Sequence, residues 1–523
     1  MAKTTRYVGN EKIRSVDALE RVLGDARYVC DMTVPDMLHA RVLRSPVPHA
    51  RVETLDVAPA LNVPGVRAVV TETDFVDHGN FGWPVKDDYV LAYRKVRYVG
   101  EPVAVVAAET ADAAQAGVDA IVLELAALPI ISDPAQALDD NAPLIPETSP
   151  TGQGNLCEQH IVRNGDPDPL LARAPVVLTG TYETPAQEHA ALETTGVLAI
   201  PEPDGGVTLY ANNQSPFINR DTVAAVLGLR AEQIRSIQPP VGGAFGGKDE
   251  VVYETSAQAA KLALLTGRPV RLILSRSESM VASYKRQPTR IQLTLGADES
   301  GKLRAARARI LVDNGAYAAG TPLAAWRATL HAAGAYRYEA VHVDTQVVYT
   351  NNGYAGAFRG FGNTAATAAV EMAVDELAYR LGRDPLAFRL ENCLRTGDRT
   401  PAGDRIAHDV GLTDCLTWVH DHSEWARKRA AYAEQPADAL RQRGIGVAAY
   451  VHGSGLGGEG EDFAYATLNV EADDSIRLTS GLTDYGQGSR TVFTLLAAEV
   501  LGVEMARIHV PRPDTYTMRD SGP

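Results

Sequence analysis

Two glycine-rich segments carry the residues best suited to hold a charged ligand. VGGAFGGKDE occupies residues 241–250, and YAGAFRGFGN occupies residues 354–363. Glycine lets backbone N–H groups approach a ligand closely and adopt positive φ. The planar, permanently charged guanidinium of Arg359 suits phosphate or another oxyanion. Two such turns in one chain predict an extended, phosphate-bearing cofactor that is gripped from two sides.

Each segment alone has a simpler interpretation. Residues 242–248 nearly fit the P-loop pattern, but Asp249 stands where Mg²⁺ chemistry needs Ser or Thr. Residues 360–365, GFGNTA, resemble the GxGxxA of a dinucleotide site, but no clean βαβ unit surrounds them. A purely structural glycine turn is the default for one motif, whereas the pair favours a ligand. A Rossmann-type dehydrogenase stays a distant alternative.

Size and charge narrow the class of protein. The chain has 523 residues, enough for about two to four domains, and a net charge of −15. Such acidity argues against nucleic acid or an anionic membrane as the main partner. No secretory leader is visible at the N-terminus, and no apolar run is long enough to span a bilayer.

The four cysteines are too scattered for an iron–sulfur or zinc site. Cys30, Cys157, Cys393 and Cys415 form no CxxC pair. They are expected to be free thiols in a reducing compartment, which favours a cytoplasmic protein.

Hydrophobic periodicity places the motifs on a mixed α/β framework. Strands are expected at 38–44, 51–57 and 66–70, with a helix that Thr110 caps. A Pro- and Asp-rich segment, residues 132–154, predicts a domain linker. Beyond it we expect a helix at 254–265, a strand at 269–275, a hairpin of 290–296 with 302–310, and a helix from Asn363, as its cap, to about Leu381.

An internal repeat links two distant parts of the chain. Gln214 precedes a helix, Leu227-Gly228-Leu229 and Ile234, while Gln487 precedes a helix, Leu501-Gly502-Val503 and Ile508. The Gln-to-Gly spacings are 14 and 15 residues, and the Gly-to-Ile spacing is six in both copies. We interpret these as two related halves, each presenting a Gln near one cofactor. Because the sequence stops at Pro523, where the second copy's own loop is expected, either another polypeptide completes the fold or the chain is a fragment.

The chain resembles the molybdenum-cofactor subunit of the xanthine dehydrogenase/aldehyde oxidase family, the molybdenum hydroxylases. The matching segments are QEHAALET (187–194), Gln214, VGGAFGGK (241–248), GAFRGFG (356–362) and DYGQG (484–488). The resemblance implies an α/β (α+β) fold in three parts. These are an N-terminal hammerhead domain (1–131), a first elongated molybdopterin-binding half (155–395), and the start of a second, incomplete half (412–523), which another chain would complete.

The resemblance also implies a reaction and its cofactors. A water-derived oxygen is added to an electron-poor carbon at a molybdenum–molybdopterin cofactor, and electrons leave through [2Fe–2S] clusters and FAD on partner subunits. No metal-binding side chains are implied, since the cofactor's dithiolene holds the molybdenum. His189 and Glu193 mimic a metal-ligand spacing, but metal binding there is not expected. High usage of Ala, Gly, Arg and Asp is typical of proteins from GC-rich bacteria. Such a source favours a cytosine dinucleotide form of the cofactor.

Individual residue roles follow from the same resemblance. Gln214 matches the Gln that hydrogen-bonds a molybdenum oxo group, and Phe361 matches an aromatic side chain that stacks on substrate. Arg359 matches an Arg at the cofactor, and Gln487 matches a pterin-binding Gln. The remaining cofactor-binding positions are Gly243, Phe245, Gly246, Gly486 and Gly488.

Two positions bear on the substrate. Asp249 stands where purine-oxidising relatives carry Glu, and Arg327 falls where they place a substrate-binding Arg. Such a pair would suit a polar N-heteroaromatic or a carboxylate-bearing substrate. An aldehyde dehydrogenase of the same family is the alternative. Carbon monoxide oxidation is not expected, because GAFRGFG lacks the Cys of those enzymes.

The general base is the main departure from the family pattern. Family members use a late Glu in a GxGE context, which is typically worth about 10²–10⁴ in rate, and nothing after Gln487 supplies it. Glu459 lies in a similar context but precedes Gln487, so we interpret it as part of an acidic loop. A second molybdopterin-binding chain is therefore expected to carry the catalytic Glu. A non-catalytic cofactor-binding remnant is the competing hypothesis.

Overall fold

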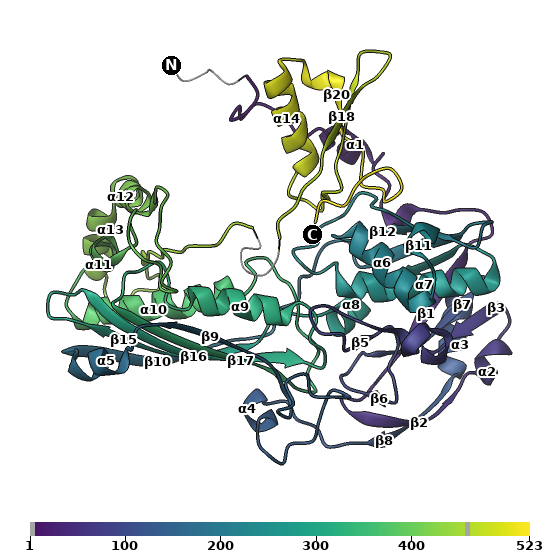
Figure 1. Cartoon of the computed structure of the whole chain (residues 1–523), viewed down its shortest axis with the longest axis horizontal. Helices are drawn as coiled ribbons and strands as arrows, with labels where there is room; N and C mark the ends of the chain where they lie inside the picture. Colours follow the sequence, from purple (N-terminus) through teal and green to yellow (C-terminus); the bar gives the residue numbers. More distant parts are fainter. Residues whose placement is uncertain (1–5, 456–460, 523) are drawn as a thin grey trace.

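The computed structural model describes residues 6–455 and 461–522. Within these ranges one sheet of seven strands and one of five carry most of the chain, and a three-stranded sheet follows them. Figure 1 shows the two large sheets side by side, with the three-stranded sheet and α14 (Ser489–Leu501) above them. None of the helices in the described ranges is long and apolar enough to cross a membrane. The architecture is the mixed α/β fold that the sequence predicts.

The strands expected in the first 130 residues all form. They are β1 (Leu38–Arg44), β2 (Ala50–Asp56) and β3 (Val66–Val70). The Thr110 side chain accepts the Ala113 N–H and so caps α3 (Ala111–Ala120) as expected. The remaining elements here are α1 (Ala18–Leu23), α2 (Ala58–Leu61), β4 (Asn80–Phe81), β5 (Asp88–Tyr89), β6 (Lys95–Val96), β7 (Pro102–Ala108) and β8 (Val122–Ala127).

The seven-stranded sheet crosses the domain boundary that we place at residue 131. Its order is β13-β12-β11-β14-β1-β7-β3. β1 pairs in parallel with β14 (Val270–Ile273) on one side and antiparallel with β7 on the other. All seven residues of β7 are buried, as is typical of a strand covered on both faces. The hammerhead region and the first half therefore share one hydrophobic core.

Helices α6 (Pro216–Leu227) and α7 (Glu250–Thr266) pack against this sheet (Figure 1). α7 contacts β11 (Gly196–Pro201) and β12 (Val207–Ala211), and α6 contacts β13 (Ile234–Ile237). α7 begins four residues before the expected position, because Asp249 is its N-cap and the helix continues through the polar start. It ends at Gly267 in the left-handed region, as the sequence predicts. α8 (Arg276–Ala282) follows β14.

The five-stranded sheet has the order β10-β15-β16-β17-β9. Its strands are β9 (Leu156–Asn164), β10 (Val176–Thr184), β15 (Thr289–Ala297), β16 (Leu303–Gly315) and β17 (Ala340–Tyr349). The expected hairpin is β15 with β16. Helices α9 (Thr321–His331) and α10 (Asn363–Arg380) pack on the sheet, while α5 (Asp168–Arg173) contacts β15 and β16.

Two local expectations differ from the structure. Asn363 is not the cap of α10, because Gly362 holds that position and the Asn363 amide donates to the Val451 carbonyl at 2.9 Å. The segment 132–154 is no loose linker. It contains α4 (Pro134–Ala137), and its Ile145 is fully buried in the core of the five-stranded sheet. A Pro- and Asp-rich composition indicates where helices and strands end. It does not indicate whether the segment packs against a hydrophobic core.

The internal repeat appears as the same sequence of elements twice. α6 ends at Gly228 and α14 at Gly502, both left-handed, and a short 3₁₀ turn and a strand follow each. β13 pairs in parallel with β12, and β20 (Ile508–His509) pairs in parallel with β19 (Ile476–Thr479). β18 (Thr467–Val470) completes the small sheet. α11 (Pro385–Asn392) lies at the end of the first half, and α12 (Leu412–His422) and α13 (Trp425–Ala433) lie at the start of the second.

The N-terminal segment packs on the second half rather than on the hammerhead region. The Tyr7 N–H donates to Glu499 of α14 at 2.7 Å, and the Val16 N–H donates to Thr491 at 3.1 Å. Tyr7 belongs to the core of the small sheet, with Ile13 packed against that core. The two ends of the described chain are thus joined in one small core.

Candidate cofactor-binding and active site

Gln214 lies where the first glycine turn and the second half meet. Its Oε1 accepts the N–H of Gly246 at 3.0 Å, and its Nε2 donates to Oδ2 of Asp249 at 3.0 Å. Its backbone carbonyl accepts the hydroxyl of Thr483 from the second half at 2.7 Å. These bonds use both ends of the amide, so the orientation of the side chain is fixed.

The two glycine-rich turns pack directly against each other. The N–H of Arg359 donates to the carbonyl of Phe245 at 2.8 Å. A Cβ on Gly246 would come within 2.7 Å of the Ala357 carbonyl oxygen, and Gly246 has φ +100°. Gly243 also has positive φ, +93°, and a Cβ there would lie 3.2 Å from the Phe245 ring. Gly246 is therefore required by the close approach of the second turn, and the positive φ of Gly243 favours glycine there.

Three exposed or partly exposed side chains project from this junction. Phe245 is 42% exposed and has φ +59°. Arg359 is exposed, and Phe361 is partly buried with φ +43°. Left-handed backbone is strained for Phe, and such strain concentrates at sites that bind ligands. The structure thus brings together Gln214, Gly243, Phe245, Gly246, Arg359 and Phe361.

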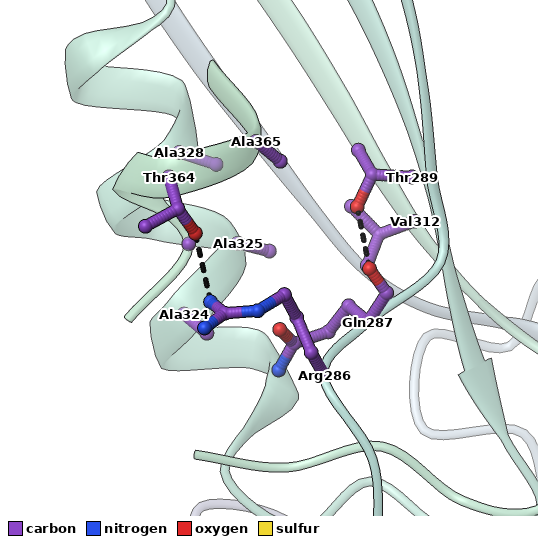
Figure 2. Close-up of a pocket in the computed structure, with 10 residues that line it drawn as sticks. Arg286, Gln287, Thr289, Val312, Ala324, Ala325, Ala328, Thr364 and Ala365 are labelled. Atoms are coloured by element: carbon purple, nitrogen blue, oxygen red, sulfur yellow. Dashed lines mark hydrogen bonds between the residues drawn. The ribbon is translucent and has the colours of Figure 1, made fainter. Parts of the chain in front are cut away.

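Three side chains hold the carbonyl oxygens of the second turn. Nε2 of Gln287 donates to the Gly356 carbonyl at 2.6 Å, and His189 Nε2 lies 2.7 Å from the Ala357 carbonyl. Arg286 donates to the Arg359 carbonyl at 2.8 Å and to the Thr364 hydroxyl at 2.7 Å. Figure 2 shows Arg286 reaching Thr364 beside α9, in a small pocket. Together these bonds set the path of residues 356–361.

Aromatic contacts reinforce this clamp. The Arg286 guanidinium lies 3.9 Å from the centre of the Phe358 ring, and the His189 ring stacks on the same ring at 4.1 Å. Burial lowers the pKa of His189 to about 4, so its imidazole is neutral near pH 7 and donates from Nε2. Sequence reasoning did not assign Arg286, Gln287 or His189 to the site. The only signal was the QEHAALET match, which gave no role to His189.

The Asp249 carboxylate accepts three side-chain hydrogen bonds. Its Oδ1 accepts from Ser215 at 3.2 Å and from the Tyr253 hydroxyl at 3.0 Å, while Oδ2 accepts from Gln214. Burial raises the pKa of the Asp249 carboxyl, and burial together with the Asp249 charge raises the pKa of neighbouring Glu250. The pair can therefore hold a proton near neutral pH. Sequence reasoning singled out Asp249 but missed Glu250.

Arg327 contacts a loop of the second half. It is 7% exposed on α9 and donates to the carbonyls of Gly453, at 3.3 Å, and Gly455. Asp249 bonds Gln214, Ser215 and Tyr253 of the first half, whereas Arg327 bonds carbonyl groups of the second half. Glu459, the residue with the GxGE-like context, lies outside the described residues.

The DYGQG loop of the second half is built around Asp484. Its Oδ1 accepts the N–H groups of Gly486 at 3.1 Å and Gly488 at 3.2 Å. The Gln487 amide bonds within the loop, with Nε2 donating to the Thr483 carbonyl at 2.8 Å and Oε1 accepting the Tyr485 N–H at 3.0 Å. Because Thr483 also bonds Gln214, the loop is anchored at the first half.

The second half is fixed to the first by further hydrogen bonds. Arg235 pairs with Asp514 at 2.5 Å, and Ser236 and Thr515 exchange bonds through their backbones and the Thr515 hydroxyl. The Gln238 N–H donates to the Pro513 carbonyl at 3.0 Å. Gln214 and Gln487 therefore lie on one rigid frame.

The site combines an exposed cation with open backbone in the DYGQG loop. In the described part of the chain, no group of three or more His, Cys, Asp and Glu is placed to hold a metal ion. Lys248 and Glu193 instead form a buried ion pair at 2.9 Å. A Cβ on Gly486 or Gly488 would meet nothing within 4 Å, so backbone in this loop stays open to a ligand. The exposed Arg359 cation and this open backbone suit an anionic, hydrogen-bonding cofactor.

Comparison with known families agrees with this arrangement. Residues 149–393 and 418–523 each match the molybdopterin cofactor-binding domain. Residues 23–129 match the aldehyde oxidase and xanthine dehydrogenase a/b hammerhead domain. The chain is also 36% identical to the nicotinate dehydrogenase large molybdopterin subunit of Eubacterium barkeri, over 80% of this chain and 96% of that protein. The chain belongs to the xanthine dehydrogenase/aldehyde oxidase family of molybdenum hydroxylases.

Other members of this family are longer than the chain. A probable xanthine dehydrogenase subunit from Bacillus subtilis is 36% identical over 97% of this chain but only 66% of its own length. The structure of aldehyde oxidoreductase from Desulfovibrio gigas superposes with a TM-score of 0.88 at 26% identity. That match covers 97% of this chain and 57% of the solved chain. The family and the fold predicted from the sequence are thus confirmed.

Proposed function

We propose that this chain is the molybdenum-binding subunit of a hydroxylase for an N-heteroaromatic substrate, purine- or nicotinate-like. The observation that carries the proposal is the position of Gln214, held between the first glycine turn, Asp249 and the DYGQG loop. When bound, the molybdenum cofactor supplies the oxygen-transfer and two-electron chemistry. Gln214 would orient its metal end, while Arg359, Gly243, Phe245, Gly246, Gly486, Gln487 and Gly488 would hold it.

The substrate would lie beside Phe361, with Asp249 and Arg327 as the polar groups that select it. A cation and a proton-holding acid suit a ring nitrogen and a carboxylate or oxo group. The two relatives named for nicotinate and xanthine support this substrate class. The likeness to an aldehyde oxidoreductase supports the alternative, an aldehyde substrate.

Partner chains would complete the enzyme. We propose a second molybdopterin-binding chain that carries the catalytic Glu, a [2Fe–2S] subunit and an FAD subunit, with a cytosine dinucleotide form of the cofactor. The four residues of β18 are all exposed, which leaves the edge of the small sheet accessible to such a chain. The E. barkeri relative, named a large molybdopterin subunit, supports this division. Free thiols at all four cysteines support a cytoplasmic location.

The test is to purify the complex through this chain and measure metal, subunits and turnover together. Molybdenum, iron and FAD with a second chain, plus turnover of nicotinate or a purine, would support the proposal. With Arg327→Ala, N-heteroaromatic turnover should fall by about 10²-fold, the cost of one lost charged contact. Aldehyde turnover that survives Arg327→Ala would favour the aldehyde alternative. Bound molybdenum without turnover would favour the cofactor-binding remnant, and a metal-free chain would overturn the catalytic assignment.

A further inference from the structure

The second copy of the repeat carries an uncovered apolar face. α14 presents Val492, Leu496 and Val500 four residues apart, so the three side chains lie on one side of the helix. All three are exposed, and so are Leu468 and Val470 of β18. Both elements lie in the part of the molecule above the two large sheets (Figure 1). Large apolar side chains gathered in this way mark a surface that another element covers.

Leu468 and Val470 lie on the face of the small sheet that α14 packs against. Their partners across the β18–β19 ladder are Leu478 and Ile476, and partners across a ladder share a face of the sheet. Leu478 and Ile476 are buried in one core with Ala498 of α14. The core of the small sheet therefore continues onto β18, where the described chain does not cover it.

The strand registers allow the two copies of the repeat to be compared residue by residue. β11 is antiparallel to β12, which is parallel to β13, and β18, β19 and β20 repeat this arrangement. The parallel pairing starts at Val207 and Ile234 in the first copy. It starts at Ile476 and Ile508 in the second. β18 thus corresponds to β11.

The corresponding strand of the first copy is buried. Ala199 of β11 lies opposite Leu209, the third residue of β12. Leu468 of β18 lies opposite Leu478, the third residue of β19. Ala199 is 0% exposed, whereas Leu468 is 49% exposed. The same place in the two copies is therefore covered in one and open in the other.

The helices of the two copies differ in the same way. Val226 of α6, two residues before Gly228, is 2% exposed and belongs to the core that includes α7. Val500 of α14, two residues before Gly502, is 83% exposed.

Two elements of the first copy have no counterpart in the described part of the second. α7 packs on β11 and against α6, and β14 then pairs antiparallel with β11 on the side away from β12. Among the described residues, no helix or strand follows β20. The second copy therefore lacks a helix in the place of α7 and a strand in the place of β14.

Other parts of this chain are already engaged elsewhere. The N-terminal segment bonds a different side of α14, at Thr491 and Glu499. A second copy of the chain would have to bring α7 and β14, and both are already packed in its own seven-stranded sheet. A further molybdopterin-binding region can supply such a unit, because the B. subtilis relative matches this chain over only 66% of its own length.

We propose that the second molybdopterin-binding chain docks here with a helix on α14 and β18, followed by a strand that pairs antiparallel with β18. The inference rests on the proposed function, which includes that chain. The helix would bury Val500 and Leu468, as their counterparts Val226 and Ala199 are buried in the first copy. The strand would extend the small sheet through main-chain hydrogen bonds.

The first test measures how much of the second molybdopterin-binding chain co-purifies with this chain, by mass spectrometry of the complex. Val500→Glu puts a carboxylate into the docked apolar face, so the ratio of the two chains should fall by about tenfold or more. Val122→Glu, at an exposed valine of β8, is the matched control and should keep the wild-type ratio.

The folding of the variants is checked by their melting temperatures. Because Val500 is exposed, Val500→Glu should melt as the wild type does. Val470→Lys, at an exposed position on β18, tests the same face if Val500→Glu misfolds, and its ratio should also fall. A wild-type ratio in a folded Val500→Glu or Val470→Lys complex overturns the proposal.

The second test identifies the occupant by a benzophenone photo-cross-linker attached to the thiol of Val500→Cys in the purified complex. The cross-links should map to one helix of the second molybdopterin-binding chain. Labelled wild type gives the background, since Cys30 and Cys415 are also exposed thiols. Cross-links to another copy of this chain, to the [2Fe–2S] subunit or to the FAD subunit overturn the docking proposal.

The two proposals fail in different ways. An active complex without a second molybdopterin-binding chain overturns the docking proposal together with the subunit division. A complex that holds this chain, cross-linked at Val500→Cys, but that turns over neither an N-heteroaromatic nor an aldehyde overturns the proposed function alone.

Discussion

Nε2 of Gln214 lies 3.0 Å from Oδ2 of Asp249, and Oε1 of the same amide accepts the Gly246 N–H at 3.0 Å. The position therefore needs a donor and an acceptor on one planar group. Glu at 214 would keep the acceptor but place a carboxylate against a partly buried acid. The start of α7 and the first glycine turn depend on this one amide for their relative position.

The first prediction concerns this amide. Gln214→Glu should lower kcat by about 10²–10³, the usual cost of one lost active-site donor. Molybdenum content, measured in parallel, should stay above half of wild type. Gln233→Glu is the control, because Gln233 Oε1 accepts from Arg230 and a carboxylate can replace it. A Gln214→Glu enzyme with normal kcat would contradict the assigned role.

The second prediction concerns the contact between the two turns. Gly246→Ala would place a methyl group 2.7 Å from the Ala357 oxygen at φ +100°, so we expect about 2 kcal/mol or more of lost stability and loss of bound cofactor. Gly267→Ala is the matched control, since its φ is +64° and a Cβ there meets nothing within 4 Å. It should cost about 1 kcal/mol and leave the cofactor in place. Equal unfolding free energies for the two variants would show that the two turns can move apart at little cost in free energy.

The third prediction concerns the clamp on the second turn. Arg286→Lys cannot bridge the Arg359 carbonyl, the Thr364 hydroxyl and the Phe358 ring at once. The turn should loosen, and trypsin should cut after exposed Arg359 faster than in the wild type, by about tenfold for each 1.4 kcal/mol lost. Arg290→Lys, at an exposed ion pair with Glu183, serves as the control. An unchanged cleavage rate in Arg286→Lys would mean that Gln287 and His189 hold the turn without it.

The fourth prediction is a dependence of stability on pH. Burial raises the folded-state pKa of Glu254 to about 8, above its value of about 4.3 in an unfolded chain. Between these values the folded state holds a proton that the unfolded state has lost, so this contribution to stability falls as pH rises toward 8. Each such group changes the free energy of unfolding by about 1.4 kcal/mol per pH unit.

Denaturant unfolding at pH 5.5 and 8.5 checks this slope. Wild type should lose more stability over the interval than Glu254→Gln, whose amide does not titrate. Glu53→Gln should behave as the wild type, because the Glu53 side chain is 50% exposed. Equal slopes in all three proteins would show that Glu254 titrates near its ordinary value.

Local pattern was enough to predict much of this fold. Alternation located β1, β2 and β3, and the Gln–helix–Gly–Ile spacing located the two copies of the repeat. These features succeed because a strand face or a helix stop depends on residues within one segment. The repeat also located Gln214, although its bonds to Gly246, Asp249 and Thr483 come from tertiary packing.

Local sequence pattern could not predict which distant strands and side chains pair with each other. Nothing in β1 indicates that Leu38 lies opposite Val270, so the shared sheet across residue 131 could not be foreseen. Arg286 resembles any basic residue before a strand, and its role depends on a carbonyl and a hydroxyl group more than 70 residues away. Glu250 reads as an ordinary first-turn acid of a helix, and only packing shows its buried oxygen. Buried polar roles arise from tertiary placement rather than from local type.

The bond between the Tyr7 N–H and Glu499 also has a consequence for the order of assembly. Ribosomes make the chain from its first residues onward, so Tyr7 must wait until about 490 later residues have been added. Until then the small core that includes Tyr7 and Ile508 lacks part of its apolar surface. Contacts of such long sequence separation form slowly. The contact between Thr483 and Gln214, which joins the two halves, is likewise completed only after most of the chain has been made.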